Sequence, residues 1–364
     1  MIKGGERPAV AIVTCTHVYN YGNSLQNYAL QKVVELYGYK AETMITDFVP
    51  AKRVLKYKVK AGIKFLQRKK DNAEKRKEIF RKFEKEFLCF SKYKNIYRNN
   101  EKVTKKYSYF IAGSDQIWNP SWYDEKKKSA FLLNFVTDNS KKIAYAPSFG
   151  VKELFPEWVE WFKTNLKSFA RLSVREKEGA KIIKDLIGEN VPVLLDPTLL
   201  LEKKEWEKMQ VKPAIVAEDE KYILVYFLGG VDSIIEKQIA DLSKDKKLKV
   251  INILKCDSFL ANQVGPLEFL YLINNASLVM TDSFHACVFS FIFQKPFLVY
   301  PRLGIEKNMF DRIKTLLDTF GLERKIVTGN ISIDIFENDY LQGMEIWKRE
   351  REKALQFIEE VLCK

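Results

Sequence analysis

The chain is poor in histidine: its 364 residues include only His17 and His285. No histidine and carboxylate cluster has the spacing of a metal site, so we expect no metal. A P-loop and a Gly-x-Gly-x-x-Gly fingerprint are also missing, which leaves a nucleoside triphosphatase or an NAD enzyme unsupported. We therefore expect no cofactor.

The five cysteines are scattered, and no two of them form a Cys-x-x-Cys pair. This pattern is typical of buried free thiols in a reducing compartment. No apolar window reaches the length of a membrane span, and the N-terminus has no apolar signal region. These absences predict a cytoplasmic protein.

Charge is abundant and unbalanced, with a formal net charge of +14. Much of the basic excess lies between Lys52 and Lys106. A solvated helical face is the simplest explanation. Attraction to an anionic substrate, or peripheral contact with anionic lipid on the inner face of a membrane, is the alternative. No nucleic-acid partner is predicted, since no zinc spacing, recognition helix or RNP-like strand accompanies the charge.

The length of the chain favours two domains, because one core rarely serves so many residues. Apolar strand-like runs alternate with helical periodicities, and the alternation restarts after a polar stretch at 210–221. The pattern predicts an α/β fold of two Rossmann-like domains with parallel sheets. The predicted parts are a first domain at 1–208 with a basic helical insertion at about 52–106, a second domain at 209–325, and a helical tail at 326–364 that packs back on the first domain.

The last strand of the first domain is predicted at 191–198. Ligands of parallel sheets bind outside the carboxyl ends of the strands. With two such sheets, the natural site is the cleft between the domains.

A strand, a polar turn and an apolar helix surround His285. Asp282 or Ser283 can cap this helix, whose N-terminal amides and dipole attract an anion. A histidine there is suited to donate a proton or to bind an anion. The alternative is a histidine that only makes a hydrogen bond within the cap.

Two polar turns of the first domain have a similar character. Gly22 and Asn23, in the turn at 20–24, suit close approach of a phosphate or sugar, and Asn23 or Ser24 can cap the next helix. Ser114, Asp115 and Trp118 follow another predicted strand and could bind a carbohydrate, with the indole ring stacked on a sugar face. A capped turn under a packed tryptophan is the alternative for the second turn.

Arg175 ends a predicted strand and can form paired hydrogen bonds with a carboxylate or phosphate. A salt bridge to Glu176 or Glu178 is the alternative. His17 is interpreted as a loop residue.

Six motifs together carry a resemblance: Tyr-Gly-Asn-Ser-Leu-Gln (21–26), Ile-Ala-Gly-Ser-Asp-Gln-Ile-Trp (111–118), Ala-Tyr-Ala-Pro-Ser-Phe-Gly (144–150), Ser-Val-Arg-Glu (173–176), Leu-Asp-Pro-Thr-Leu-Leu (195–200) and Thr-Asp-Ser-Phe-His (281–285). In this order, over about residues 10 to 320, they resemble the polysaccharide pyruvyl transferases. The resemblance implies a GT-B-like fold. It also implies transfer of a pyruvyl group from phosphoenolpyruvate to two hydroxyls of a sugar, often lipid-linked, in a surface-glycan precursor.

The resemblance predicts His285 and Arg175 as the catalytic residues, with acid–base catalysis by His285 and donor binding by Arg175. It extends the donor site to a further set of residues, namely Ser283, Lys307, Asn308, Arg312, Gly22 and Asn23. It places the acceptor near Ser114, Asp115 and Trp118.

Two positions depart from the family pattern. Many members have an arginine shortly before the histidine, where this chain has Asp282-Ser-Phe-His, so the second cationic contact with the donor has no clear source. Asn23 stands where an aspartate is frequent, so no acid–base role is expected of it. Two other functions remain open, namely a GT-B glycosyltransferase that uses a nucleotide sugar and a non-catalytic glycan- or lipid-surface-binding protein.

Overall fold

The computed structural model describes residues 7–16, 19–45, 72–93, 100–122, 125–253, 263–303, 310–329, 331, 336 and 339–363. His17, Lys307, Asn308 and part of the basic insertion lie outside these residues, and their predicted roles stay predictions.

The first sheet is parallel and has five strands in the order β2-β1-β3-β4-β5. β1 (Ala9–Val13) is buried along its whole length, as expected for a strand with helices on both faces. Its neighbours are β2 (Lys40–Thr43) and β3 (Tyr109–Ala112), with Val10 opposite both Ala41 and Tyr109. The outer strands are β4 (Lys142–Ala144) and β5 (Arg171–Leu172).

The second sheet is also parallel, in the order β7-β6-β8-β9. Its strands are β6 (Tyr222–Tyr226), β7 (Lys249–Asn252), β8 (Leu278–Thr281) and β9 (Phe297–Val299). The predicted α/β fold with two parallel sheets is confirmed.

The prediction of a strand at 191–198 is wrong. The segment makes one isolated bridge, from Val174 to Val193, and then turns into the 3-10 helix η2 (Pro197–Leu199). Pro192 and Pro197 have no N–H group to donate to a strand ladder, which explains why pairing stops there.

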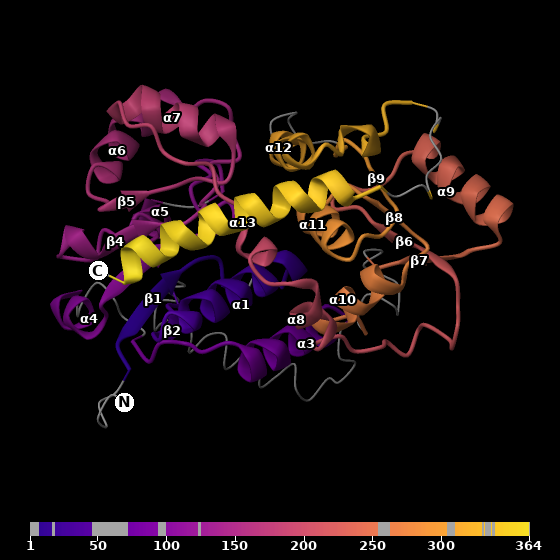
Figure 1. The fold of residues 1–364 in the computed structure, drawn as a ribbon, viewed down its shortest axis with the longest axis horizontal. Coiled ribbons are helices and arrows are strands. Elements are labelled where there is room, and N and C mark those ends of the chain that lie inside the picture. The colour runs from indigo at the N-terminus through magenta and orange to yellow at the C-terminus, as the bar shows by residue number, and fades with distance from the viewer. Residues whose placement is uncertain are drawn as a thin grey trace, which may run out of the picture.

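Helices cover the sheets and connect them (Figure 1). In the first domain these are α1 (Tyr21–Leu36), α3 (Asn72–Phe87), α4 (Asn100–Lys106), α5 (Glu125–Phe131), η1 (Asn139–Lys141), α6 (Pro156–Leu166), α7 (Lys177–Ile187) and α8 (Lys203–Glu207). They are followed by α9 (Ser233–Lys246), α10 (Pro266–Asn275), α11 (Phe284–Ile292), α12 (Asp311–Phe320), η5 (Glu323–Lys325) and α13 (Leu341–Leu362).

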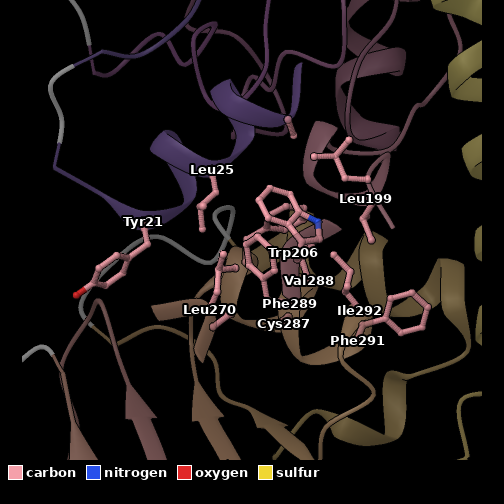
Figure 2. Close-up of a cluster of buried hydrophobic side chains, with 14 of the residues drawn as sticks. Tyr21, Leu25, Leu199, Trp206, Leu270, Cys287, Val288, Phe289, Phe291 and Ile292 are labelled. Atoms are coloured by element: carbon pink, nitrogen blue, oxygen red, sulfur yellow. The ribbon is translucent and has the colours of Figure 1, made fainter. Parts of the chain in front are cut away.

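One apolar core contains residues from the two sheet-containing parts of the chain, here called the first and second domain. The rings of Tyr21 on α1 and Phe269 on α10 stack with centroids 4.4 Å apart. Trp206 of α8 meets Phe289 of α11 edge-on at 5.1 Å. Figure 2 shows Trp206 between the side chains of α1 and those of α11. This shared core fixes the distance between the N-terminal ends of α1 and α11.

The helix α13 runs across the front of both domains (yellow in Figure 1). Trp347 Nε1 donates to the Leu199 carbonyl at 2.8 Å, and Arg351 Nε donates to the Leu200 carbonyl at 2.7 Å. Near its end, the Leu362 carbonyl accepts from the Tyr39 hydroxyl at 2.6 Å. The helix is therefore attached to η2 and to the edge of the first sheet.

Candidate functional site

The site forms where α1 and α11 begin. Ser283 caps α11 by accepting from the Ala286 amide at 3.5 Å, so its hydroxyl is used within the helix. Asp282, the other predicted cap, instead accepts from the amides of Leu228 and Gly229 at 2.6 and 2.8 Å. The cap places His285 in the first turn of α11.

His285 lies directly against Gly22 of the first domain. A Cβ on Gly22 would be 1.9 Å from His285 Nδ1, so only glycine fits here. The α1 cap is Asn20, not the predicted Asn23 or Ser24; its Oδ1 accepts from the Gly22 amide at 2.9 Å. The group packed against Gly22 is therefore the imidazole, and the close approach of a phosphate or sugar stays a prediction.

A buried aspartate connects the two predicted catalytic residues. Arg175 Nη1 donates to Asp196 Oδ2 at 2.6 Å, and His285 Nε2 lies 3.6 Å from the same oxygen. Asp196 belongs to one of the six motifs, but sequence reasoning gave it no role. Its position follows from local structure, since it caps η2 by accepting from the Thr198 amide at 3.0 Å.

A second aspartate brings together residues of both domains. Asp115 Oδ1 accepts from Arg175 Nη2 at 3.2 Å and from Arg312 Nη1 at 3.4 Å. Its other oxygen accepts from the side-chain amide of Asn23. The described ion pairs of Arg175 are thus with Asp115 and Asp196, and not with the neighbouring glutamates considered above.

Arg312, at the start of α12, supplies a second guanidinium. With its oxygen turned toward Arg312, the Gln116 side chain accepts from Nε and Nη2 at 2.9 Å each. The guanidinium carbons of Arg175 and Arg312 lie 4.7 and 5.7 Å from the ring centroid of Phe284. An aromatic face near two cations favours their charged forms.

The charges stabilise one another in this buried site. Burial by itself would raise the pKa of Asp196, but His285, Arg175 and Thr198 outweigh it and hold the pKa well below its usual range. The pKa of Asp115 is lowered in the same way, with Arg175 the largest opposing charge. Burial and the nearby Arg175 lower the pKa of Arg312 to about 10, so it remains protonated at neutral pH. Asp115 and Asp196 are therefore ionised, and so are the arginines with which they pair.

A cavity of about 290 Å³ opens beside these pairs and lies between the domains. Arg175, Lys177 and Asp196 line it from the first domain, and Phe284 and Arg312 from the second. Leucines of both domains make its apolar walls, and Glu350 of α13 borders it. Arg175, Lys177 and Arg312 make the cavity suited to an anion.

Two predicted acceptor residues do not reach this cavity. Trp118 is 1% exposed, its ring packs against Phe149 at 5.3 Å, and its Nε1 donates to the Phe131 carbonyl. The prediction that its ring stacks on a sugar is wrong, and the packed tryptophan of the alternative is found. Ser114 is fully buried and donates to the Ala146 carbonyl at 2.8 Å, so it supports the turn from within.

The sequence analysis missed three residues of the candidate site: Asp196, Phe284 and Lys177. Asp196 and Phe284 each lie inside a motif already noted, which was the available signal. Lys177 is the first residue of α7, two positions after Arg175, and nothing local distinguishes it from other lysines.

Within the described residues, no group of three or more His, Cys, Asp or Glu side chains could hold a metal ion. Over the same residues, no helix is long and apolar enough to cross a membrane.

The family model of polysaccharide pyruvyl transferases matches residues 20–302. This span includes Gly22, Arg175, Asp196 and His285, whereas Arg312 lies beyond it. A search of curated proteins found no match.

Several solved structures are similar to the chain. UDP-GlcNAc 2-epimerase from Neisseria meningitidis, bound to UDP-GlcNAc, is 12% identical with a TM-score of 0.49, over 98% of this chain and 99% of that one. A UDP-glucosyltransferase from Polygonum tinctorium is 10% identical with a TM-score of 0.44, over 98% and 99%. The E. coli ADP-heptose lps heptosyltransferase II is 9% identical with a TM-score of 0.38, over 98% of each chain. All three TM-scores are below 0.5, so these similarities carry no argument. The assignment of the fold depends on the two parallel sheets described above.

Proposed function

Since the chain belongs to the polysaccharide pyruvyl transferase family, we propose that it transfers the pyruvyl group of phosphoenolpyruvate to two hydroxyls of one sugar. The product is a cyclic pyruvate ketal on a cell-surface polysaccharide precursor. The observation that carries this proposal is that Arg175 and Arg312 line one small cavity, while His285 lies 3.6 Å from Asp196, which lines the same cavity.

The proposed donor site is this cavity. Small-molecule pockets measure roughly 300–1,000 Å³, so a volume of about 290 Å³ suits a compact ligand. Phosphoenolpyruvate carries a carboxylate and a phosphate, and a guanidinium binds either group with paired hydrogen bonds. Arg312 supplies the second cationic contact that the sequence left without a source, and Lys177 a third. Lys307 and Asn308 remain proposed donor residues.

The proposed chemistry begins with a proton. His285 gives a proton to the methylene carbon of phosphoenolpyruvate, which takes the electron pair of the double bond and becomes a methyl group. The first sugar hydroxyl attacks C2 and releases its proton. The bond from C2 to the phosphate oxygen then breaks, and phosphate leaves with the electron pair. The second hydroxyl attacks C2 to close the ring. Of the two released protons, one restores His285 and the other leaves with phosphate.

Asn23 and Asp115 are the residues that we propose for the acceptor side. Asp115 has a backbone φ of 72° and its carboxylate is held by both arginines, so its direction is well defined. We also propose that the acceptor is lipid-linked and that the protein acts in the cytoplasm at the membrane surface. The basic residues between Lys52 and Lys106 support the proposed location at the membrane surface.

Incubation with phosphoenolpyruvate and a panel of lipid-linked or aryl glycosides tests the proposal. We expect phosphate release together with a product heavier by one pyruvyl ketal. His285→Ala should lower kcat by about 10²–10⁴-fold, the usual contribution of a general acid, while acceptor binding survives. Turnover that persists in this variant would remove His285 from the mechanism.

Thermal unfolding distinguishes the other two functions. A ligand at 100 times its Kd stabilises the native state by about 2.7 kcal/mol. Phosphoenolpyruvate should raise Tm if the proposal holds, and a UDP- or GDP-sugar should do so for a nucleotide-sugar transferase. Binding of a glycan with no turnover of any donor would indicate a binding protein.

A further inference from the structure

Asp196 occupies an unusual position for an aspartate. It is 1% exposed and lies between the two domains. Its Oδ1 accepts from the Thr198 amide and hydroxyl at 3.0 and 2.7 Å. Its Oδ2 accepts from Arg175 at 2.6 Å and from the Ser114 hydroxyl at 3.4 Å, and it also faces His285 Nε2. Capping η2 requires only Oδ1, so local structure does not explain why Oδ2 is held beside Arg175 and His285.

The two nitrogens of His285 have different surroundings. Nδ1 lies over the backbone of Gly22, in the first turn of α1. Nε2 is buried and has no hydrogen-bond partner among the described residues, and the carboxylate 3.6 Å away is its close charged neighbour. The other charged groups at this point are Arg175, which shares the Asp196 oxygen, and Asp115, whose ionised state His285 also favours. The tautomer of an imidazole follows from what each of its nitrogens faces.

Asp196 remains ionised at neutral pH, because the charges around it outweigh the effect of burial on its pKa. A fixed negative charge beside Nε2 favours a proton on that nitrogen. The ring itself cannot turn away, because Gly22 packs on one side of it and the edge of Phe284 on another, at a centroid distance of 5.2 Å.

We propose that Asp196 is the positioning residue for His285, holding the imidazole with its proton on Nε2, toward the cavity residues. This inference rests on the proposed function for its consequence: the doubly protonated ring gives its Nδ1 proton to the methylene carbon of phosphoenolpyruvate and is left neutral, with the Nε2 proton held beside Asp196. Asp196 also borders the proposed donor cavity, but we assign it no contact with the reacting atoms. It acts by fixing which nitrogen carries the proton and where that nitrogen points.

The composition of the chain makes a direct test practical. His17→Gln leaves His285 as the sole imidazole, so nitrogen NMR of protein labelled with ¹⁵N-histidine reports one side chain. In this parent at pH 7 we expect the signals of a ring protonated on Nε2. Adding Asp196→Asn should lower the Nε2-protonated fraction several-fold. Thr198→Val is the matched control, because it removes a hydroxyl from the other oxygen of the same carboxylate, and it should leave the signals unchanged.

Two results would overturn the inference: a parent protonated on Nδ1 alone, or unchanged signals in a folded Asp196→Asn variant. If that variant does not fold, Asp196→Ala, which also removes the charge, is measured in the same parent, and unchanged signals there count against the inference equally. An equal effect of Thr198→Val would also contradict it, since a general loosening of η2 would then explain both.

Kinetics provide the second measurement. With phosphoenolpyruvate and a working acceptor, Asp196→Asn should lower kcat by about 10²–10⁴-fold and displace the pH profile of kcat, and Asp196→Glu should recover part of the rate. A variant that loses only donor affinity would place Asp196 in support of Arg175 alone. If the parent shows no turnover with any acceptor, the proposed function fails, but the NMR result still decides the role of Asp196.

Discussion

Gly22 shows how one missing side chain can define a site. In a helix, glycine is less favourable than alanine by about 1 kcal/mol, so Gly22→Ala should strengthen α1 locally. The added methyl group would nevertheless overlap the imidazole, and His285 must move. We predict a loss of kcat of at least tenfold and a lower Tm, because overpacking a buried site is destabilising. Gly329→Ala is the control, because a Cβ at that position meets open space.

Arg312 is a second residue whose chemistry can be tested. Its guanidinium binds Gln116 through two nitrogens and Asp115 through one, a geometry that lysine cannot reproduce. Arg312→Lys keeps the charge, so we predict a KM for phosphoenolpyruvate raised at least tenfold with the fold intact.

The same change at the exposed Arg349 should leave KM as it is. If Arg312→Lys has the same KM as the parent protein, Arg312 does not bind the donor.

Residue type and local pattern predicted part of the site. His285 and Arg175 were found because a helix start and a strand end are recognisable within a few residues. Asp196 was not assigned, because its contact with Arg175 forms only when the first domain folds, and its contact with His285 only when the two sheets pack together. Trp118 was misassigned because an aromatic residue in a polar turn has the same sequence signature whether it is exposed or buried.

At the scale of elements, α13 supports the segment that carries Asp196. It binds the carbonyl of Leu199 through Trp347, three residues after Asp196. Trp347→Phe keeps most of the ring but removes this hydrogen bond, which we expect to cost about 0.5–1.5 kcal/mol.

We predict a measurable fall in Tm by calorimetry and a lower kcat, because η2 is less well held. A variant that loses stability but keeps kcat would show that α13 supports the fold without supporting the site.

Elements also show where a pattern has limits. The first strand was predicted because five consecutive apolar residues admit few alternatives. The segment at 191–198 is also rich in apolar residues, but its two prolines limit it to a single bridge. That interruption is useful to the site, since the chain turns there and presents Asp196 to both domains.

At the scale of the whole molecule, acid should weaken the connection between the domains. Asp115 and Asp196 have pKa values lower in the folded protein than their usual value, so the unfolded chain binds more protons below about pH 4. The stability that they contribute is complete above that pH and is lost as the pH falls through the folded-state values. Glu176 acts in the opposite sense, because burial raises its pKa.

We therefore predict that the free energy of unfolding falls steeply between pH 5 and pH 2 when measured with urea. Asp115→Asn should have lower stability at pH 7 and a shallower dependence on pH over this range. An unchanged slope in this variant would mean that other carboxylates govern the acid transition.

The sequence by itself determined the alternation of strands and helices, the two parallel sheets, and the helix start that carries His285. These follow from periodicity and capping, which act between residues only a few positions apart. Only the tertiary structure decided which carboxylates meet Arg175, Arg312 and His285, and that Trp118 is buried. The reason is physical: those contacts join residues far apart in the chain, and the packing of one apolar core across both domains sets their distances.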